Sequence, residues 1–396
     1  MAKTFKFGEN GKWATKTGSS LAYNDQNGNF KPAPFSVTRG SIATRVNKQG
    51  LIEVVGKDKL RIDYTDSSKG VALLEPARSN VLTYSEDFSQ WLPIGTPTID
   101  LNNIVSPDGN LNGTKITRGS NPTPLRLGTP NILNNAHTFT LYAKKGNYDK
   151  LGLDIGDEEE LRFILTDEWQ RFEVTSTPTT YNHVDITLPL SSSGDYIYIY
   201  GAQLEAGSYA TSYIPTSGQS GGVPRAADVA NGAGNAQVFN DSEGVLFANM
   251  FIEDNIEDNV NISVSGGVHE ENTFKFIYLS STNDFRVELN RSSISETTVD
   301  YSNLSLGQYN KIASSFNAST LKLYVNGFEI NSTPTNALPS GLNQMNFDRA
   351  DGVAPFYGKA KEIGVYDAVL TDAELEALTS YTSFTNMANE LNLTIK

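Results

Sequence analysis

Short stretches in which polar and apolar side chains alternate recur along this chain, and they limit its fold more than any other feature. In residues 138–142, Phe139 and Leu141 alternate with Thr and Tyr, and residues 161–166 repeat the pattern. A period of two is typical of a β-strand with one face buried and the other exposed. Because turn residues separate many such stretches, the sequence predicts β-sandwich or jelly-roll domains.

The second half of the chain carries one strong hairpin signal and one helix signal. Strand-like runs at residues 321–325 and 328–330 flank Asn326–Gly327, a pair that supplies the positive φ angles of a type I′ turn. Thr371–Glu374 has the spacing of a capping box, which predicts a short helix. We therefore expect an all-β fold with little helix.

Changes in composition predict how the chain divides into domains. The first part is rich in Gly, Lys and Asn and would struggle to bury a large core alone, so we expect it to lean on a partner or on neighbouring subunits. Gly, Ser and two prolines in the middle predict a flexible linker. The expected order is an irregular N-terminal region at 1–79, a β-sandwich at 80–216, a linker at 217–236, a second β-sandwich at 237–380 and a polar tail at 381–396.

The chain is acidic, with a formal net charge of −14 over 396 residues. An acidic chain repels phosphate backbones, so nucleic acid is not an expected partner. Residues 1–40 differ, because they hold six basic and two acidic residues. Lys3, Lys6, Lys12 and Lys16 predict either a basic surface that docks on an acidic partner or a solvated, lysine-rich terminus.

The absence of cysteine narrows the chemistry and the compartment. It excludes disulfides, thiolate metal sites and cysteine nucleophiles, and it fits assembly in a reducing cytoplasm. No apolar run follows the N-terminal lysines, and none reaches the ~20 residues of a membrane helix. We therefore expect neither a signal peptide nor membrane insertion.

Motifs at both ends of the first predicted sandwich resemble those of one family. The first set comprises Thr38-Arg39, residues 43–53, Leu74-Glu-Pro-Ala-Arg-Ser-Asn-Val-Leu-Thr-Tyr-Ser-Glu-Asp-Phe88 and Trp91. The second set comprises Tyr198-Ile-Tyr-Gly-Ala-Gln-Leu-Glu-Ala-Gly207, Thr211-Ser-Tyr-Ile-Pro-Thr216 and Pro224-Arg-Ala-Ala-Asp-Val229. Together they resemble bacteriophage fibre and virion surface proteins, in which such segments frame a jelly roll similar to carbohydrate-binding modules.

The second predicted sandwich resembles laminin-G and concanavalin-A-like lectin domains. The resemblance rests on residues 319–327 and on residues 358–375, which include the predicted capping box. The chain departs from that pattern at Gln308-Tyr-Asn-Lys311, where the family usually has a Trp-His pair. The resemblance therefore implies the fold and carries over no ligand preference.

Taken together, the resemblances imply a bacteriophage structural protein on the particle surface, in a head or tail fibre. It is expected to be assembled in the host bacterial cytoplasm, to dock on other virion proteins through residues 1–79, to form a homotrimer and to bind host-surface polysaccharide without catalysis. Two alternatives stay open: a capsid decoration or connector protein that binds no sugar, and a polysaccharide-degrading tailspike.

Candidate glycan contacts are three tyrosines in one strand-like run. Tyr196, Tyr198 and Tyr200 fall on one face, with Ile197 and Ile199 on the other. Aromatic faces pack against the C–H groups of sugars, so the stripe predicts a sugar platform. Leu204 continues the same parity, however, so the stripe fits a buried core or a subunit interface equally. Trp91 and Trp169 are expected to be core anchors.

No cofactor is required, although calcium is a possible ligand. Asn346, Asp348 and Asp351 lie close together in a predicted loop, and hard cations take several such oxygens. The other interpretation is a plain acidic loop, since no EF-hand spacing is present.

Catalytic residues are not predicted. The acidic run at 157–160 and the pair Asp254 and Asp258 are carboxylate groups of the kind that hydrolases use, but the run is typical of a solvated loop. The three histidines, His137, His183 and His269, show no second His or Asp at metal-ligand spacing and are interpreted as ordinary strand or loop residues.

Overall fold

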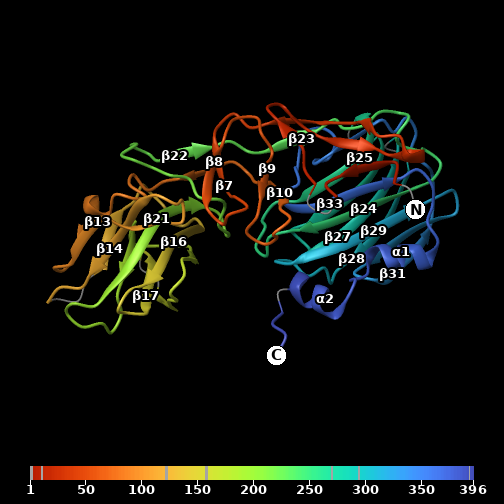
Figure 1. Cartoon of the computed structure of the whole chain (residues 1–396). Helices are drawn as coiled ribbons and strands as arrows, with labels where there is room; N and C mark the ends of the chain where they lie inside the picture. The colour runs from red at the N-terminus through yellow and green to blue at the C-terminus, as the bar shows by residue number, and fades with distance from the viewer. Residues whose placement is uncertain are drawn as a thin grey trace. The chain divides into compact units, whose positions relative to one another are not determined.

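The computed structural model confirms the all-β class, with strands forming nearly all of the regular structure (Figure 1). It describes residues 3–9, 12–120, 124–156, 159–268, 271–292, 295–391 and 393–396. The chain forms two compact units, and each is built from segments that are separated in the sequence. The first comprises Met1–Gly40, Gly56–Pro76 and Ala227–Lys396, and the second comprises Ser41–Val55 and Ala77–Ala226.

The second unit is a sandwich of two five-stranded antiparallel sheets. One sheet has the order β13-β14-β21-β16-β19 and the other β12-β15-β20-β17-β18. The strands of the first sheet are β13 (Thr98–Val105), β14 (Leu111–Thr117), β21 (Tyr196–Ala206), β16 (His137–Lys145) and β19 (Gln170–Ser176). Those of the other are β12 (Leu92–Pro93), β15 (Pro124–Gly128), β20 (His183–Thr187), β17 (Lys150–Ile155) and β18 (Leu161–Ile164).

Alternating apolar side chains from both sheets of the second unit meet in one core. Phe139 and Leu141 of β16 are fully buried there with Leu151 and Leu153 of β17, as the period-two pattern predicts. Trp91, which follows the short 3-10 helix η2 (Phe88–Gln90), is 1% exposed in the same core. Two further antiparallel pairs complete the unit: β7 (Ala43–Val46) with β8 (Ile52–Val55), and β11 (Arg78–Asn80) with β22 (Val223–Arg225).

The first unit pairs a large sheet with a five-stranded one. The large sheet has the order β31-β30-β29-β24-β33-β1-β4-β5, with β10 paired to β33 and to β9, and the other has the order β28-β27-β26-β25-β32. Phe274 of the five-stranded sheet packs its ring 4.8 Å from that of Phe316 in the large sheet, which links the two layers. A small four-stranded sheet with the order β2-β3-β6-β23 also belongs to the first unit.

The strands and helices of the first unit come from its N-terminal segments and its long C-terminal segment. The N-terminal segments hold β1 (Phe5–Phe7), β2 (Thr15–Lys16), β3 (Ser19–Ser20), β4 (Ala22–Asn24), the 3-10 helix η1 (Gln26–Gly28), β5 (Lys31–Pro32), β6 (Phe35–Thr38), β9 (Arg61–Asp63) and β10 (Val71–Leu74). The C-terminal segment holds β23 (Val229–Asn231), β24 (Gly244–Phe251), β25 (Val260–Val268), β26 (Glu271–Leu279), β27 (Asp284–Arg291), β28 (Ser295–Tyr301), β29 (Tyr309–Phe316), β30 (Thr320–Val325), β31 (Phe328–Pro334), β32 (Gln344–Asn346), β33 (Gly358–Tyr366), α1 (Asp372–Thr379) and α2 (Phe384–Glu390).

Residues 1–79 do not form a separate unit in this structure, in contrast to the sequence-based boundaries. β1 pairs antiparallel with β33, and Phe5 and Phe7 are fully buried. The ring of Phe7 lies 4.8 Å from that of Phe35 and 5.4 Å from that of Phe347, so N-terminal and C-terminal residues share one core. The N-terminal segment thus obtains the core that it lacks alone from the C-terminal part of the same chain.

The predicted linker at 217–236 is also structured over much of its length. It contributes β22 to the second unit and β23, which pairs with β6, to the first. Asp228 is 1% exposed and binds Arg39 at 2.7 Å. Asp228 also binds Arg61, which in turn donates to Glu75 at 2.6 Å. Buried charges of this kind fix a segment in place, so the flexible linker expected from Gly and Ser is not what the chain forms here.

Helices are few and short. The capping box at Thr371 and Glu374 is present at the start of α1, as predicted. α2 lies within the predicted polar tail, and Ser383 caps it. Neither of these helices has the length and apolar character needed to cross a membrane.

Candidate functional site

The outer face of the sheet β13-β14-β21-β16-β19 combines exposed aromatic rings with basic side chains. Tyr196 and Tyr198 of β21 point away from the core, because Ile197 and Ile199 between them are fully buried. Both tyrosines remain partly exposed. β21 lies between β14 and β16, as Figure 1 shows.

The strand register places a lysine on each side of the second tyrosine. Tyr198 lies directly opposite Lys115 of β14 and opposite Lys144 of β16. Opposite residues of antiparallel strands have Cβ atoms about 5 Å apart, so all three side chains emerge together. We call Lys115, Lys144, Tyr196 and Tyr198 the Tyr–Lys face.

Close packing holds the two rings in position. The rings of Tyr196 and Tyr198 meet edge to face with centroids 5.6 Å apart, and the ammonium of Lys115 lies 4.0 Å from the centroid of Tyr196. A Cβ atom at Gly146 would stand 2.4 Å from the Tyr196 ring, so a side chain there would force the ring to move. The rings are therefore positioned by their neighbours before any ligand binds.

Neither lysine of the face has a carboxylate partner among the described residues. Asp100 of β13 lies opposite Lys115 in the register, but the Lys115 ammonium is placed over the Tyr196 ring instead. In a chain with a net charge of −14, two lysines beside two aromatic rings, with no ion pair to a described carboxylate, form a local exception. Such a group can pack against sugar C–H surfaces and attract an anionic substituent.

The third predicted tyrosine does not belong to this face as a contact residue. Tyr200 is 2% exposed and packs with Ile52, Tyr213, Tyr142 and Trp169. Its hydroxyl donates to Asp108 at 3.2 Å, and burial together with nearby carboxylates raises its pKa above the ordinary value. Tyr200 is thus a structural residue. Trp169, expected to be a core anchor, belongs to this outer cluster rather than to the sandwich core, and it donates to the carbonyl of Val105 at 3.0 Å.

A β-bulge explains why the parity argument for the tyrosines is wrong. Gly201 has a φ of +64°, and the register between β16 and β21 shifts between Thr140 and Tyr142. One extra residue in a strand moves all later side chains to the opposite face. Leu204 therefore lies in the core although it shares the even numbering of Tyr196 and Tyr198, which lie outside.

The predicted calcium ligands are engaged by donors of the protein itself. Asn346 accepts from the backbone N–H of Gly232 at 2.8 Å. The carboxylate of Asp348 accepts from Asn231 and from the backbone of Ala350. Asp351 accepts from Arg349 and Val353 at 2.9 and 3.0 Å. These bonds hold all three side chains in place. Asn346 is the last residue of β32 and not a loop residue, in contrast to the sequence-based expectation.

The four N-terminal lysines divide into two pairs. Lys3 is paired with Glu362, and burial lowers its pKa to about 8. Lys6 is paired with Asp25 and, at 3.3 Å, with Glu9. Lys12 and Lys16 are exposed. The lysines do not act as one basic surface, because half of them stabilise the first unit through internal ion pairs.

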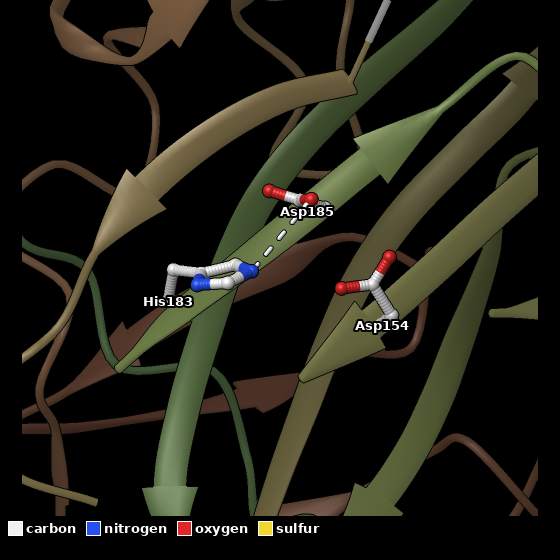
Figure 2. Close-up of side chains that lie close together, drawn as sticks. All are labelled: Asp154, His183 and Asp185. Carbon is white, nitrogen blue, oxygen red and sulfur yellow. Dashed lines mark ion pairs between the residues drawn. The ribbon is translucent and has the colours of Figure 1, made fainter. Parts of the chain in front are cut away.

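A cluster of ionisable side chains on the other sheet of the second unit was not predicted from the sequence. Figure 2 shows Asp154 of β17 facing His183 and Asp185 of β20. One ligand atom from each lies within 4.8 Å of the others. Burial, Asp185 and Glu160 raise the pKa of Asp154 to about 7. Because His183 and Asp185 are two positions apart on one strand, the spacing was a usable signal; the approach of Asp154 depends on strand pairing that the sequence does not reveal.

The charge around this cluster argues against assigning it a cation. Arg126 donates to both oxygens of Asp185, at 2.7 and 2.6 Å, and so occupies the carboxylate that a metal would need. Glu160 binds Arg162 and Thr187 beside it. Asp157 and Glu158 of the acidic run, and His269, lie outside the described residues. We therefore assign no metal site to the cluster.

Comparisons with solved structures return sugar-binding and sugar-processing proteins at low similarity. The CBM40 of the Ruminococcus gnavus IT-sialidase, bound to α2,3-sialyllactose, is 21% identical with a TM-score of 0.32, over 38% of this chain and 93% of that one. Domain 4 of a GH43 extracellular arabinanase from Geobacillus stearothermophilus, in complex with arabinotriose, is 15% identical with a TM-score of 0.31, over 39% and 73%. At such values these likenesses identify neither a ligand nor a binding residue in this chain.

The family comparison concerns the first unit alone. No curated protein sequence matches the chain significantly. Residues 253–376, which contain the whole five-stranded sheet and β29, β30, β31 and β33 of the large one, match the family model of the concanavalin A-like lectin/glucanases superfamily. This part of the chain is therefore similar to the concanavalin A-like lectins and glucanases.

Proposed function

We propose that this protein is a non-catalytic glycan-binding protein whose Tyr–Lys face binds acidic polysaccharide. The observation that carries the proposal is the position of partly exposed Tyr196 and Tyr198 beside Lys115 and Lys144, which lack carboxylate partners among the described residues. A lectin-like domain in the same chain supports binding rather than catalysis.

The chemistry of the face favours a sugar that carries a carboxylate. Each ring offers an apolar surface to sugar C–H groups, and an ammonium beside it can donate charge-assisted hydrogen bonds to a uronate or similar group. A neutral sugar would leave both lysines uncompensated. Contacts of this kind are weak individually, so an oligomer that presents several faces would gain ~100-fold or more in avidity.

The proposed setting is the surface of a bacteriophage particle, in a head or tail fibre assembled in the host cytoplasm. It is supported by the virion-protein motifs, which form structural features here: Asn80, Tyr213 and Gln203 of these motifs join the segments around β11 and β21 by hydrogen bonds. The proposed partners are other virion proteins, two further copies of the chain and host polysaccharide. Exposed Lys12 and Lys16 are the lysines left to dock on a virion protein.

The test is a glycan array that pairs acidic polysaccharides with neutral ones of related backbone, probed with the full chain. We expect binding to the acidic members, weakened about tenfold by Tyr198→Ala or Lys144→Gln. Tyr181→Ala and Lys48→Gln are matched controls, because Tyr181 and Lys48 are exposed residues of the second unit that do not belong to the face.

Three outcomes would contradict the proposal. Binding that is indifferent to Tyr198→Ala and Lys144→Gln removes the face from the function. No binding to any glycan, together with particles that lose stability without the protein, supports a decoration or connector protein instead. New reducing ends released from acidic polysaccharide would indicate a tailspike hydrolase.

A further inference from the structure

A polar cleft in the second unit lies apart from the residues of the Tyr–Lys face. Its volume is about 400 Å³, within the range of clefts that hold small molecules. Most of the described lining residues are polar, and they include Glu86, Asp87, Asn112, Thr216 and Gln219. No lysine or arginine is among them.

A partly buried carboxylate, that of Glu86, lines the cleft. Glu86 accepts from the hydroxyl of Tyr213 at 2.8 Å and from that of Tyr200 at 3.3 Å, both through Oε1. Its second oxygen, Oε2, has a long contact of 3.4 Å with the amide of Asn112. Burial raises the pKa of Glu86. One oxygen of this carboxylate is thus fixed by the protein, and the other is the weaker-bonded one.

Two further oxygens on residues that line the cleft have no hydrogen-bond partner among the residues that the structure describes. They are Oγ1 of Thr216, a residue that is 5% exposed, and Oδ1 of Asn112. A buried oxygen without a donor costs about 1–3 kcal/mol. Each of these oxygens has less than 1 Å² of accessible surface, so a ligand hydroxyl reaches it only when the side chain rotates towards the cleft. A donor that meets the rotated oxygen would remove this cost, which favours a ligand that is rich in donors.

The cleft lies where two of the motif segments quoted from the sequence, residues 74–88 and 211–216, meet. Ser85 donates its backbone N–H to the carbonyl of Thr216 and accepts from the Thr216 N–H at 2.8 Å. Gly218 donates to the carbonyl of Thr83 at 2.7 Å. These bonds tie residues 83–86 to residues 216–218, so the cleft walls are held by backbone contacts.

We infer that this cleft is a second ligand site, for one residue of a neutral, hydroxyl-rich saccharide. The acceptors Glu86, Asn112 and Thr216 would take hydroxyl donors, while Leu101 and Pro215 offer apolar wall to the C–H side of the ring. An anionic sugar is disfavoured by Glu86 and Asp87. The cleft therefore selects the chemistry opposite to that of the Tyr–Lys face, and the inference does not depend on the proposed function of that face.

The first experiment blocks the cleft from its exposed rim. The full chain is mixed with methyl glycosides of glucose, galactose, mannose and N-acetylglucosamine, and binding is measured by saturation-transfer NMR. Ser217→Trp fills the cleft from an exposed lining position. Ser193→Trp makes the same change at an exposed residue outside the lining. We expect at least one glycoside to bind the native chain and Ser193→Trp alike, and to bind Ser217→Trp about tenfold more weakly or not at all.

A second pair of variants tests the role of Thr216 Oγ1 without filling the cleft. Thr216→Val removes an Oγ1 that has no partner in the described part of the chain, and Thr114→Val removes an Oγ1 outside the cleft that also lacks a partner there. Neither change should lower the melting temperature, because neither breaks a hydrogen bond. Only Thr216→Val should weaken glycoside binding.

The outcomes separate this inference from the function proposed for the Tyr–Lys face. Tyr198→Ala should leave glycoside binding unchanged, and Ser217→Trp should leave acidic-polysaccharide binding unchanged. The inference is overturned if none of the four glycosides binds, or if the binding survives Ser217→Trp. It is also overturned if calcium chloride alone raises the melting temperature of the native chain but not of Ser217→Trp, which would indicate a cation in the cleft.

Discussion

Arg39 and Asp228 lie 189 positions apart in the sequence, yet their side chains form an ion pair of 2.7 Å in which both partners are about 1% exposed. Asp228 also accepts from Arg61 and from the backbone N–H of Glu75, so three segments of the first unit meet at one carboxylate. The pair joins the Thr-Arg motif near the N-terminus to the Arg-Ala-Ala-Asp motif after the first sandwich.

Asp228→Asn should destabilise the first unit strongly. The change leaves Arg39 and Arg61 buried without a full countercharge, which typically costs about 3–5 kcal/mol. Urea unfolding followed by a probe in the first unit measures the loss. Asp300→Asn is the matched control, because Asp300 pairs with Arg286 at an exposed site and should lose less than about 1 kcal/mol. Equal effects of the two changes would contradict a structural role for the buried pair.

Phe7→Ala should show that the N-terminal strand belongs to the lectin-like sandwich. Phe7 is fully buried between Phe35 and Phe347, and truncating a buried phenylalanine costs about 3–5 kcal/mol. Phe30→Ala, at a residue that is 75% exposed, should change stability little. Thermal unfolding of both variants is the measurement, and an unchanged melting temperature for Phe7→Ala would argue that β1 is not part of the sandwich.

Gly201→Ala should weaken the β-bulge that separates the outward-facing Tyr196 and Tyr198 from the inward-facing Leu204. A left-handed φ of +64° costs a residue with a Cβ about 1–2 kcal/mol, and this Cβ would also stand 3.3 Å from the rings of Tyr142 and Tyr213. Gly194→Ala also has a positive φ but meets open space, so it isolates the backbone cost. Differential scanning calorimetry should rank Gly201→Ala as the more damaging change.

Asp154→Asn should stabilise the second unit at neutral and alkaline pH. The pKa of Asp154 is raised in the folded chain from 3.8 to about 7, so the folded state holds its proton more tightly than the unfolded state. The stabilisation that this tighter proton binding provides is therefore fully present below pH ~4 and is lost as pH rises towards ~7. In the ionised state the carboxylate of Asp154 faces that of Asp185 on the neighbouring strand. Removing this like-charge pair should gain about 0.2–1 kcal/mol at pH ~8.

The measurement for Asp154→Asn is the melting temperature as a function of pH. The gain should vanish near pH ~4, where the native carboxyl is protonated. Asp167→Asn, at a largely exposed carboxylate, should show no such pH dependence. A gain that is constant across the range would contradict the raised pKa.

Local sequence signals predicted the elements whose partners are close in the chain. Asn326–Gly327 joins β30 to β31 with φ angles of +50° and +91°, as a type I′ turn requires. Thr371 and Glu374 cap α1 as their spacing predicts. These features depend on neighbouring residues alone, so the sequence contains all the information that fixes them.

Long-range pairing accounts for what the sequence did not reveal. Phe5 and Phe7 form too short a pattern to indicate a core strand until β33 is placed beside them. Lys115 and Lys144 flank Tyr198 only through the register of β14 and β16 with β21. Gly201 was visible in the sequence, but its bulge depends on the φ angle that the surrounding strands impose.

The pairing of β1 with β33 also constrains how the chain is made. Strand β1 leaves the ribosome before the second unit is made, and its partner β33 (Gly358–Tyr366) leaves after it. During synthesis, β1 can pair with the neighbouring β4 but must wait for β33 while the whole second unit emerges and has the opportunity to fold. We therefore expect truncated chains that end before β33 to hold a finished second unit and an apolar N-terminal segment that chaperones can capture.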